Sequence, residues 1–195
     1  MLTYLVACLL IPAVSSMRGE CKVDLITTEF DHNPDAWKLI GKTHKDYYLM
    51  FVSKKTVDLK KCVRTVRSIN VPTKKFNRQL TYSYWDGTEL HTENITLGIK
   101  KTSQCYVYEN EVTATKGKGG KREKWYSEVI YSDYSTCLLM QSRTLGYNVW
   151  TAVDYMKQHN ETPYLCVLLY EIFAGTEKHW VYDSDLCTQH QVKIP

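Results

Sequence analysis

The chain has 195 residues and a formal net charge of +4, with 44% apolar and 24% charged side chains. This composition fits one folded domain of ordinary size and excludes an intrinsically disordered chain. The small positive charge does not indicate a nucleic-acid-binding protein, which usually carries a strongly basic surface. Fifteen Tyr and five Trp are many for this length, and they predict an aromatic core or a ring-lined ligand pocket.

The first residues have the pattern of a secretory signal. Leu2 to Val14 form a short apolar run that ends in small residues, and no charged side chain precedes Arg18. The run is shorter than the roughly 20 apolar residues that cross a bilayer, so we expect a signal peptide over 1–16 rather than a membrane anchor. The remaining 17–195 is expected to form one secreted domain, with no later segment that crosses a membrane.

Six cysteines remain after the signal, and an even number in a secreted chain predicts three disulfides whose pairing the residues alone leave open. They are Cys21, Cys62, Cys105, Cys137, Cys166 and Cys187. No spacing of Cys and His residues matches a zinc site, so we expect no metal and no other cofactor. Sequons at Asn94 and Asn160 predict a glycoprotein.

A short helix and a series of strands are predicted next along the chain. The helix covers 33–41, with Asn33 as the N-cap, Pro34 at the first helical position and Gly41 at its end. Eight segments rich in Tyr, Val, Ile and Thr then predict short strands, separated by turn residues. The predicted strands are 46–53, 61–71, 78–85, 92–100, 105–115, 124–132, 136–143 and 147–155.

A second helix is predicted over 162–175, capped by Thr162, with Pro163 at its first position and Gly175 at its end. Its apolar residues at helical spacing are expected to lie against a sheet. They are Leu165, Leu168, Leu169, Ile172 and Phe173. Eight strands without βαβ alternation predict an all-β fold, either an antiparallel barrel that can hold one small ligand or a packed two-sheet sandwich.

The sequon in the fourth strand predicts which side chains face the interior. A glycosylated Asn94 must point to solvent, so Glu93 points inward together with Ile95, Leu97 and Ile99. Burying an unpaired carboxylate costs several kcal/mol. Glu93 is therefore expected either in water at a barrel mouth or inside, where it would meet a cationic ligand.

The strand over 105–115 gives a second prediction of this kind. Glu109 and Glu111 are expected to face solvent, which turns Tyr106 and Tyr108 inward. In the strand over 78–85, alternation likewise places three side chains on the inner face. These are Leu80, Tyr82 and Tyr84. In the strand over 124–132 neither face is cleanly polar, so the direction of Glu128 stays ambiguous.

Several short motifs occur in the order and spacing of a known family. They are Asp35-Ala36-Trp37-Lys38, Tyr47-Tyr48-Leu49-Met50, Cys62-Val63, Val129 to Asp133 followed by Cys137, Asn148-Val149-Trp150 and Cys166. In these motifs the chain resembles the tick salivary lipocalins, the family that includes the histamine-binding proteins. The resemblance implies an eight-stranded antiparallel barrel around a small ligand, with a short N-terminal helix and a C-terminal helix packed outside. It also implies the disulfides Cys62–Cys187 and Cys137–Cys166, which leaves Cys21 and Cys105 as a third pair.

The resemblance further implies a ligand set. Amine-binding members hold an ammonium group between carboxylates and aromatic rings, because a cation that leaves water needs an opposite charge and gains from ring faces. The matching positions are Glu93, Tyr106, Tyr108, Tyr126 and Glu128, with Asp58 a looser match and Trp150 in the last strand. Trp37 either contacts the ligand or plugs the closed end of the barrel.

Two positions depart from the amine-binding pattern. Leu138 follows Cys137 where amine-binding members usually carry an acid, and Asn148 stands two residues before Trp150 where they usually carry Glu. Those acids serve a second amine site in the family, so their absence weakens the amine interpretation. A leukotriene or fatty acid is the alternative ligand. The candidates to meet its carboxylate are Lys54, Arg64 and Arg67.

The basic, glycine-rich tip over 116–124 lacks the phosphate-loop pattern and predicts a solvated turn, or a contact with a sulfated glycan or acidic host protein. No catalytic residue set is visible, so we expect no enzyme. Together with the signal peptide, the resemblance implies a secreted monomer that sequesters histamine or serotonin and suppresses the host inflammatory response. The alternative of another class is a protein-binding inhibitor of complement or haemostasis that acts through surface loops. Nucleic-acid and membrane partners are not expected.

Overall fold

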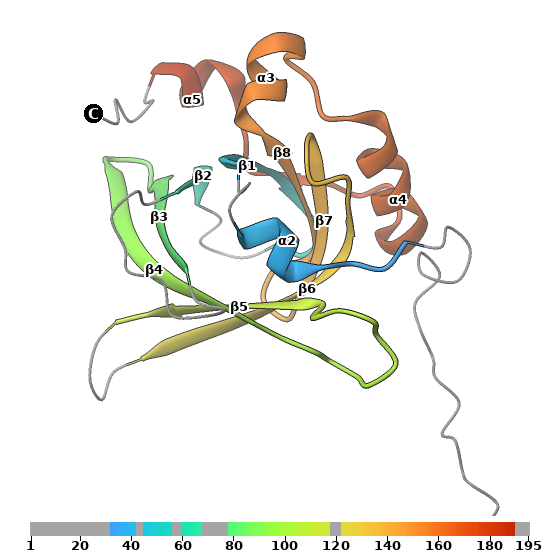
Figure 1. The fold of residues 1–195 in the computed structure, drawn as a ribbon. Coiled ribbons are helices and arrows are strands. Elements are labelled where there is room, and N and C mark those ends of the chain that lie inside the picture. Colours follow the sequence, from blue (N-terminus) through green and yellow to red (C-terminus); the bar gives the residue numbers. More distant parts are fainter. Residues whose placement is uncertain (1–31, 42–44, 56–59, 68–77, 118–121, 190–195) are drawn as a thin grey trace, which may run out of the picture.

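Eight antiparallel strands close into a barrel in the computed structural model, which describes residues 32–41, 45–55, 60–67, 78–117 and 122–189 (Figure 1). Closure follows because β1 (Tyr47–Val52) pairs with both β2 (Lys61–Arg67) and β8 (Gly146–Ala152). The other strands pair with their neighbours in chain order. They are β3 (Arg78–Trp85), β4 (Leu90–Lys100), β5 (Glu111–Lys116), β6 (Glu123–Ser132) and β7 (Cys137–Ser142). The barrel prediction is confirmed and the sandwich is excluded.

A short helix closes one end of this barrel. Figure 1 shows this helix, α2 (Ala36–Ile40), beside the barrel strands. The side chains of Ala36, Leu39 and Ile40 are buried in the same cluster as the inner-face residues of the strands. The inner-face members of the cluster include Tyr47, Leu80, Leu97, Val112, Val129, Leu138 and Met140. The closed end also carries the β4–β5 and β6–β7 connections, because the Ala36 amide donates to the Glu109 carbonyl and the Asp35 amide donates to the Tyr134 hydroxyl. The β1–β2, β3–β4, β5–β6 and β7–β8 connections therefore border the opposite end, called the mouth below.

The N-cap of α2 is Asp35, not the predicted Asn33. The Asp35 carboxylate accepts a hydrogen bond from the Lys38 amide (2.9 Å), three residues further on, as an N-cap side chain does. Gly41 ends the helix as predicted. The helix is shorter than expected because its first buried residue, Ala36, is also the point at which it is tied to the β4–β5 connection.

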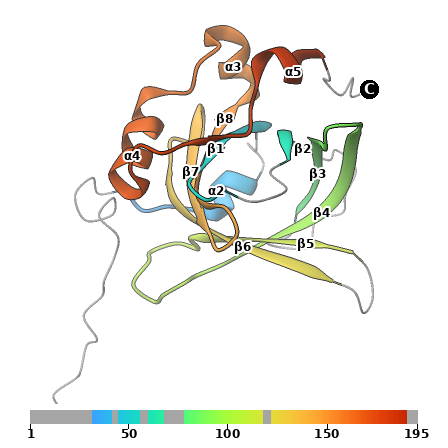
Figure 2. The same cartoon turned by 180° about the vertical axis from the view of Figure 1, so that it is seen from behind.

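In the part of the chain that the structure describes, three helices and a short strand lie outside the barrel: α3 (Val153–His159), α4 (Tyr164–Ala174), β9 (His179–Trp180) and α5 (Ser184–Gln189). Figure 2 shows the segment between α4 and α5 crossing the barrel over β1, where β9 pairs with Phe51 and Val52. A second apolar cluster fills the space between α4 and the outer faces of β1, β7 and β8. The second predicted helix is thus confirmed as an outer helix, although Pro163 is its N-cap rather than Thr162.

The buried face of α4 differs from the predicted one. Leu169 and Phe173 pack against the barrel as expected, but Leu165, Leu168 and Ile172 are exposed. Instead, the residues that share the buried face with Leu169 are Cys166 and Tyr170. The disulfide Cys137–Cys166 fixes this rotation, because it holds one side of the helix against the start of β7.

The structure corrects a boundary of two predicted strands by three residues or more. The strand expected over 147–155 ends at Ala152, where Val153 begins α3 and its amide donates to the Asp46 carbonyl. The strand expected over 105–115 begins only at Glu111, since the preceding residues form a loop. The Asn110 side chain holds this loop by accepting from the Thr102 amide and donating to its hydroxyl, a local arrangement that competes with strand pairing.

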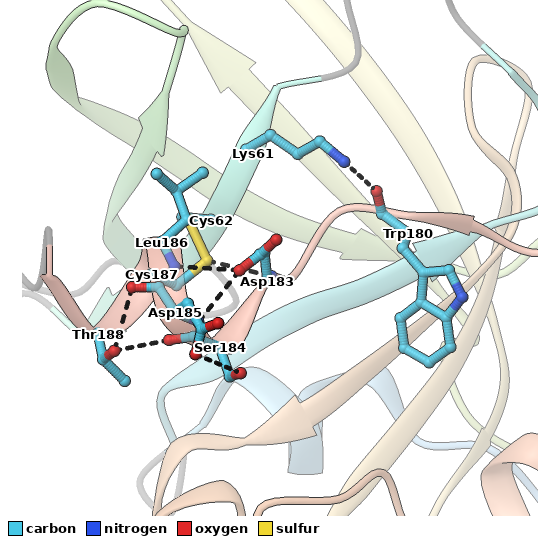
Figure 3. The surroundings of a disulfide bond; sticks show 9 residues. All are labelled: Lys61, Cys62, Trp180, Asp183, Ser184, Asp185, Leu186, Cys187 and Thr188. Atoms are coloured by element: carbon cyan, nitrogen blue, oxygen red, sulfur yellow. Dashed lines mark hydrogen bonds between the residues drawn. A yellow bond between two sulfur atoms is a disulfide. The ribbon is translucent and has the colours of Figure 1, made fainter.

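Both disulfides implied by the resemblance are present. Cys62–Cys187 ties α5 to the start of β2, and Cys137–Cys166 ties α4 to β7. Figure 3 shows the first of these beside Lys61, whose ammonium group donates to the Trp180 carbonyl (2.6 Å). Cys105 is also disulfide-bonded. Its expected partner Cys21, like the predicted signal peptide over 1–16, lies outside the described residues.

Candidate functional site at the barrel mouth

Glu93 lies on the inner face of β4, near the mouth. Its inward direction confirms the register predicted from Asn94, which is exposed on the outer face and accepts from the Thr81 hydroxyl (3.1 Å). The carboxylate oxygen Oε1 of Glu93 accepts hydrogen bonds from the Lys116 ammonium group (2.8 Å) and the Tyr84 hydroxyl (3.3 Å). Glu93 is the carboxylate whose inward direction the strand register predicted. It therefore already has a cationic partner in the structure.

Aromatic rings and a second lysine complete the surroundings of Glu93. The rings of Tyr82 and Tyr84 lie 5.3 Å apart, and the Lys60 ammonium group stands 3.5 Å from the centre of the Tyr84 ring. The Lys116 hydrogen bond lowers the pKa of Glu93 against the opposing effect of burial, and the charges of Lys116 and Lys60 add to this. Glu93 is therefore ionised at neutral pH, and the groups around it are those that hold an ammonium ion.

Tyr126 and Glu128 lie on the other side of the barrel wall. Their neighbours Trp125 and Ser127 pair with Ala114 and Val112, which face the interior, so alternation turns Tyr126 and Glu128 outward. The Tyr126 ring is exposed beneath the ammonium groups of Lys100 (4.9 Å) and Lys124 (5.2 Å). Glu128 accepts from the Asn110 amide (2.8 Å) in the loop before β5. The structure thus does not bring these two residues together with Glu93.

The next two predicted residues, Tyr106 and Tyr108, lie in the β4–β5 loop and not in a strand. Tyr106 is buried within this loop, whereas the Tyr108 side chain is 47% exposed. Glu111 lies on the outer face, as alternation predicted, but it is buried there and pairs with Lys100 (3.1 Å) instead of facing open solvent. Counting alternation backward from Glu111 fails because the strand does not extend that far.

The two predicted tryptophans pack against the interior from different elements. Trp37 packs against the interior cluster from α2, beneath the Arg78 guanidinium (4.3 Å), which favours the plug over the ligand contact. Trp150 packs against the interior from β8. Asp58 and most of the basic tip lie outside the described residues.

The lysines at the mouth were the residues that sequence analysis missed. Of the predicted partners for a ligand carboxylate, Arg64 pairs with Asp46 (3.2 Å) and Lys54 donates to the Arg143 carbonyl (2.9 Å). Lys60 and Lys116 face Glu93 and Tyr84 instead. For Lys116 a signal existed in the sequence, since alternation from Val112 places it on the inner face at the end of β5.

Within the described ranges, no group of three or more His, Cys, Asp or Glu side chains could hold a metal ion. Over the same part of the chain, no helix has the length and apolar character needed to cross a membrane.

Comparison with known proteins identifies the family of this chain. Residues 27–189 match the family model described as tick histamine binding protein. The chain belongs to this family. Searching the curated proteins gives no significant match.

Among solved structures, the crystal structure of an AM182 serotonin complex is similar at a TM-score of 0.57 and 18% identity, covering 78% of this chain and 93% of that one. Japanin from Rhipicephalus appendiculatus bound to cholesterol is similar at a TM-score of 0.49 and 15% identity, covering 76% of this chain and 97% of that one. At its level of identity, the first likeness shows a shared barrel fold.

Two neutral side chains occupy interior positions in β7 and β8. Leu138 is buried opposite Trp150, and Asn148 is buried opposite Met140. The Asn148 amide accepts from the Trp150 indole nitrogen (2.7 Å) and donates to the Gly146 carbonyl (2.9 Å). These side chains are neutral and their polar atoms are satisfied, so neither supplies a second inward carboxylate.

Proposed function

We propose that this protein binds a small ligand inside its barrel and that the ligand is a biogenic amine, histamine or serotonin, held at Glu93. The observation that carries the proposal is an ionised carboxylate on the inner face beside the rings of Tyr82 and Tyr84. A cation leaving water requires such a charge and gains from such rings. The family's description as histamine-binding and the serotonin complex of AM182 support this choice of ligand.

A ligand amine would exchange with the ammonium group of Lys116. That exchange costs little, because the Lys116 and Glu93 side chains remain 39% and 24% exposed and such ion pairs contribute about 0–1 kcal/mol. Once Lys116 has moved aside, Glu93 and the Tyr84 hydroxyl are available to the ligand. The protein thus holds its amine-binding groups in place before the ligand arrives, which limits the entropy lost on binding.

Such binding would be stoichiometric and non-enzymatic. A secreted member of a tick family that removes histamine or serotonin from the host tissue would weaken the inflammatory response there. The disulfide-bonded cysteines support an oxidising, extracellular setting for this role.

A second candidate ligand is an amphipathic carboxylate such as a leukotriene or fatty acid. Two observations favour it, the neutral buried side chains of Leu138 and Asn148 and the two lysines at the mouth. In that case Lys60 and Lys116 would bind the ligand carboxylate, and the apolar inner face would hold its chain.

Calorimetric titration of the wild type and of Glu93→Gln with histamine, serotonin and a fatty acid tests both candidates. We expect Glu93→Gln to weaken amine binding about tenfold or more, since hydrogen bonds to charged groups contribute about 1.5–3 kcal/mol. Fatty-acid binding should be unchanged or stronger. Glu111→Gln is the matched control, because it removes a lysine-paired carboxylate from the outer face. Equal amine affinity in both variants would overturn the site, and binding of the fatty acid alone would favour the second candidate.

A further inference from the structure

A separate cleft of about 420 Å³ lies at the closed end of the barrel. It is formed by the segment that leads into α2, the β4–β5 loop and the end of β6 with the β6–β7 turn. Its wall includes the rings of Tyr108, Tyr131 and Tyr134 and the carboxylates of Asp35 and Asp133. Its volume is within the range of small-molecule sites. It shares no residue with the surroundings of Glu93.

The rings of this cleft are already arranged around cationic and aromatic groups. The Lys38 ammonium group lies 4.3 Å from the centre of the Tyr134 ring, so the face of this ring accepts a cation. The His32 ring lies 4.8 Å from the ring of Tyr131. Flat side chains therefore form a wall against which a small aromatic molecule can stack.

The Asp133 carboxylate of the cleft keeps its negative charge. The Asp133 carboxylate accepts hydrogen bonds from the amides of Ser135 (2.9 Å), Thr136 (2.8 Å) and Cys137 (3.0 Å) and from the Thr136 hydroxyl. Burial raises the pKa of Asp133, but these hydrogen bonds outweigh it and hold the pKa below its usual value. Backbone amides carry no net charge. The charge of Asp133 is therefore still available to a ligand.

We propose that this cleft is a second binding site, for a small aromatic compound that carries an ammonium group. Two carboxylates face one lysine in the cleft, so its charge favours a cation and opposes an anion. The ammonium group replaces Lys38 at the ring of Tyr134, and the aromatic body lies against Tyr108 and Tyr131. The cleft is distinct from the neutral interior positions Leu138 and Asn148, and it does not depend on ligand binding at Glu93.

The test is a titration of the full disulfide-bonded protein with serotonin, carried out in the Glu93→Gln background so that the barrel site does not contribute. Tyr108→Ala should weaken the remaining binding about two- to fivefold, as expected for one cation–π or stacking contact at an exposed site. Tyr108→Phe, which keeps the ring, should restore it. Lys38→Gln should strengthen binding by a similar factor, because it removes the competing ammonium group.

Two substitutions outside the cleft serve as controls. Tyr164→Ala removes a tyrosine that is 78% exposed on α4, and Lys157→Gln removes an exposed lysine from α3. Neither should change the affinity of the cleft. The proposal is overturned if the Glu93→Gln protein binds no serotonin, or if the Tyr108 and Lys38 variants bind it as the two controls do. If Glu93→Gln leaves serotonin binding unchanged, the proposal for the barrel site fails. The Tyr108 and Lys38 variants then still test whether serotonin binds in the cleft.

Discussion

The two ends of the barrel use the same side-chain types with opposite electrostatic results. At the mouth, Glu93 receives its hydrogen bonds from Lys116 and Tyr84. At the closed end, Asp133 receives most of its hydrogen bonds from backbone amides. A lysine cancels the charge that it binds, whereas an amide leaves it in place. The group that satisfies a carboxylate thus decides how much of its charge a ligand can use.

Each end also carries its own disulfide, and comparing the two gives the largest expected effect. Cys62–Cys187 joins positions 125 residues apart at the mouth end, and Cys137–Cys166 joins positions 29 apart at the closed end. The loop-entropy model predicts losses of about 5 kcal/mol and about 3.5 kcal/mol when the two bonds are removed by paired Cys→Ser changes. Urea unfolding measures both values. A larger loss for the shorter loop would show that packing around the buried Cys166 outweighs chain entropy.

Each end of the barrel also has an aspartate that caps a turn, and replacing these aspartates is expected to reduce stability less than removing a disulfide. Asp133 caps the β6–β7 turn, and Asp86 caps the β3–β4 turn at the mouth by accepting from the Thr88 and Glu89 amides. We expect Asp133→Ala to lower the free energy of unfolding by about 1.5 kcal/mol, since it removes hydrogen bonds from a partly buried charged acceptor. Asp86→Ala should cost less because Asp86 is exposed and water replaces its partner. Equal losses in thermal unfolding would contradict this order.

The pH dependence of the Asp133 effect follows from the direction of its pKa shift. The pKa is lower in the folded state than the ordinary value of 3.8, so the ionised form stabilises the fold. This contribution is complete above the ordinary value and is lost as the pH falls through the lower folded value. The difference in unfolding free energy between wild type and Asp133→Ala should therefore be constant from about pH 7 to pH 5 and shrink only below 3.8. A difference that shrinks already at about pH 6 would contradict this assignment.

The smallest expected effect concerns ligand choice at the mouth. Lys116→Gln removes the ammonium group that competes for Glu93, so amine affinity should rise about two- to fivefold. Fatty-acid affinity should fall, because the same change removes a cation from the mouth. Lys100→Gln is the control, since Lys100 forms a similar pair with Glu111 on the outer face. A fall in amine affinity in Lys116→Gln would show that Lys116 supports the amine site rather than competing for it.

Much of the barrel could be predicted from local patterns. Strand alternation is a short-range property, so a single solvent-facing residue such as Asn94 placed Glu93, Leu97 and Ile99 on the inner face without any knowledge of the fold. The same method failed for Tyr106 and Tyr108, because Asn110 and Thr102 hold a loop that interrupts the period before Glu111. A pattern can be counted only across residues that belong to one strand.

By itself, the sequence determined the all-β class, two of the helices and the inward direction of Glu93, and resemblance to a family supplied the pairing of Cys62 with Cys187 and of Cys137 with Cys166. Only the tertiary structure decided which groups meet. Lys116 is 23 residues from Glu93 along the chain, and Tyr134 is 99 residues from Asp35. Such contacts depend on the pairing of β4 with β5 and on where α2 closes the barrel. Those are long-range choices, which periodicity within one element does not encode.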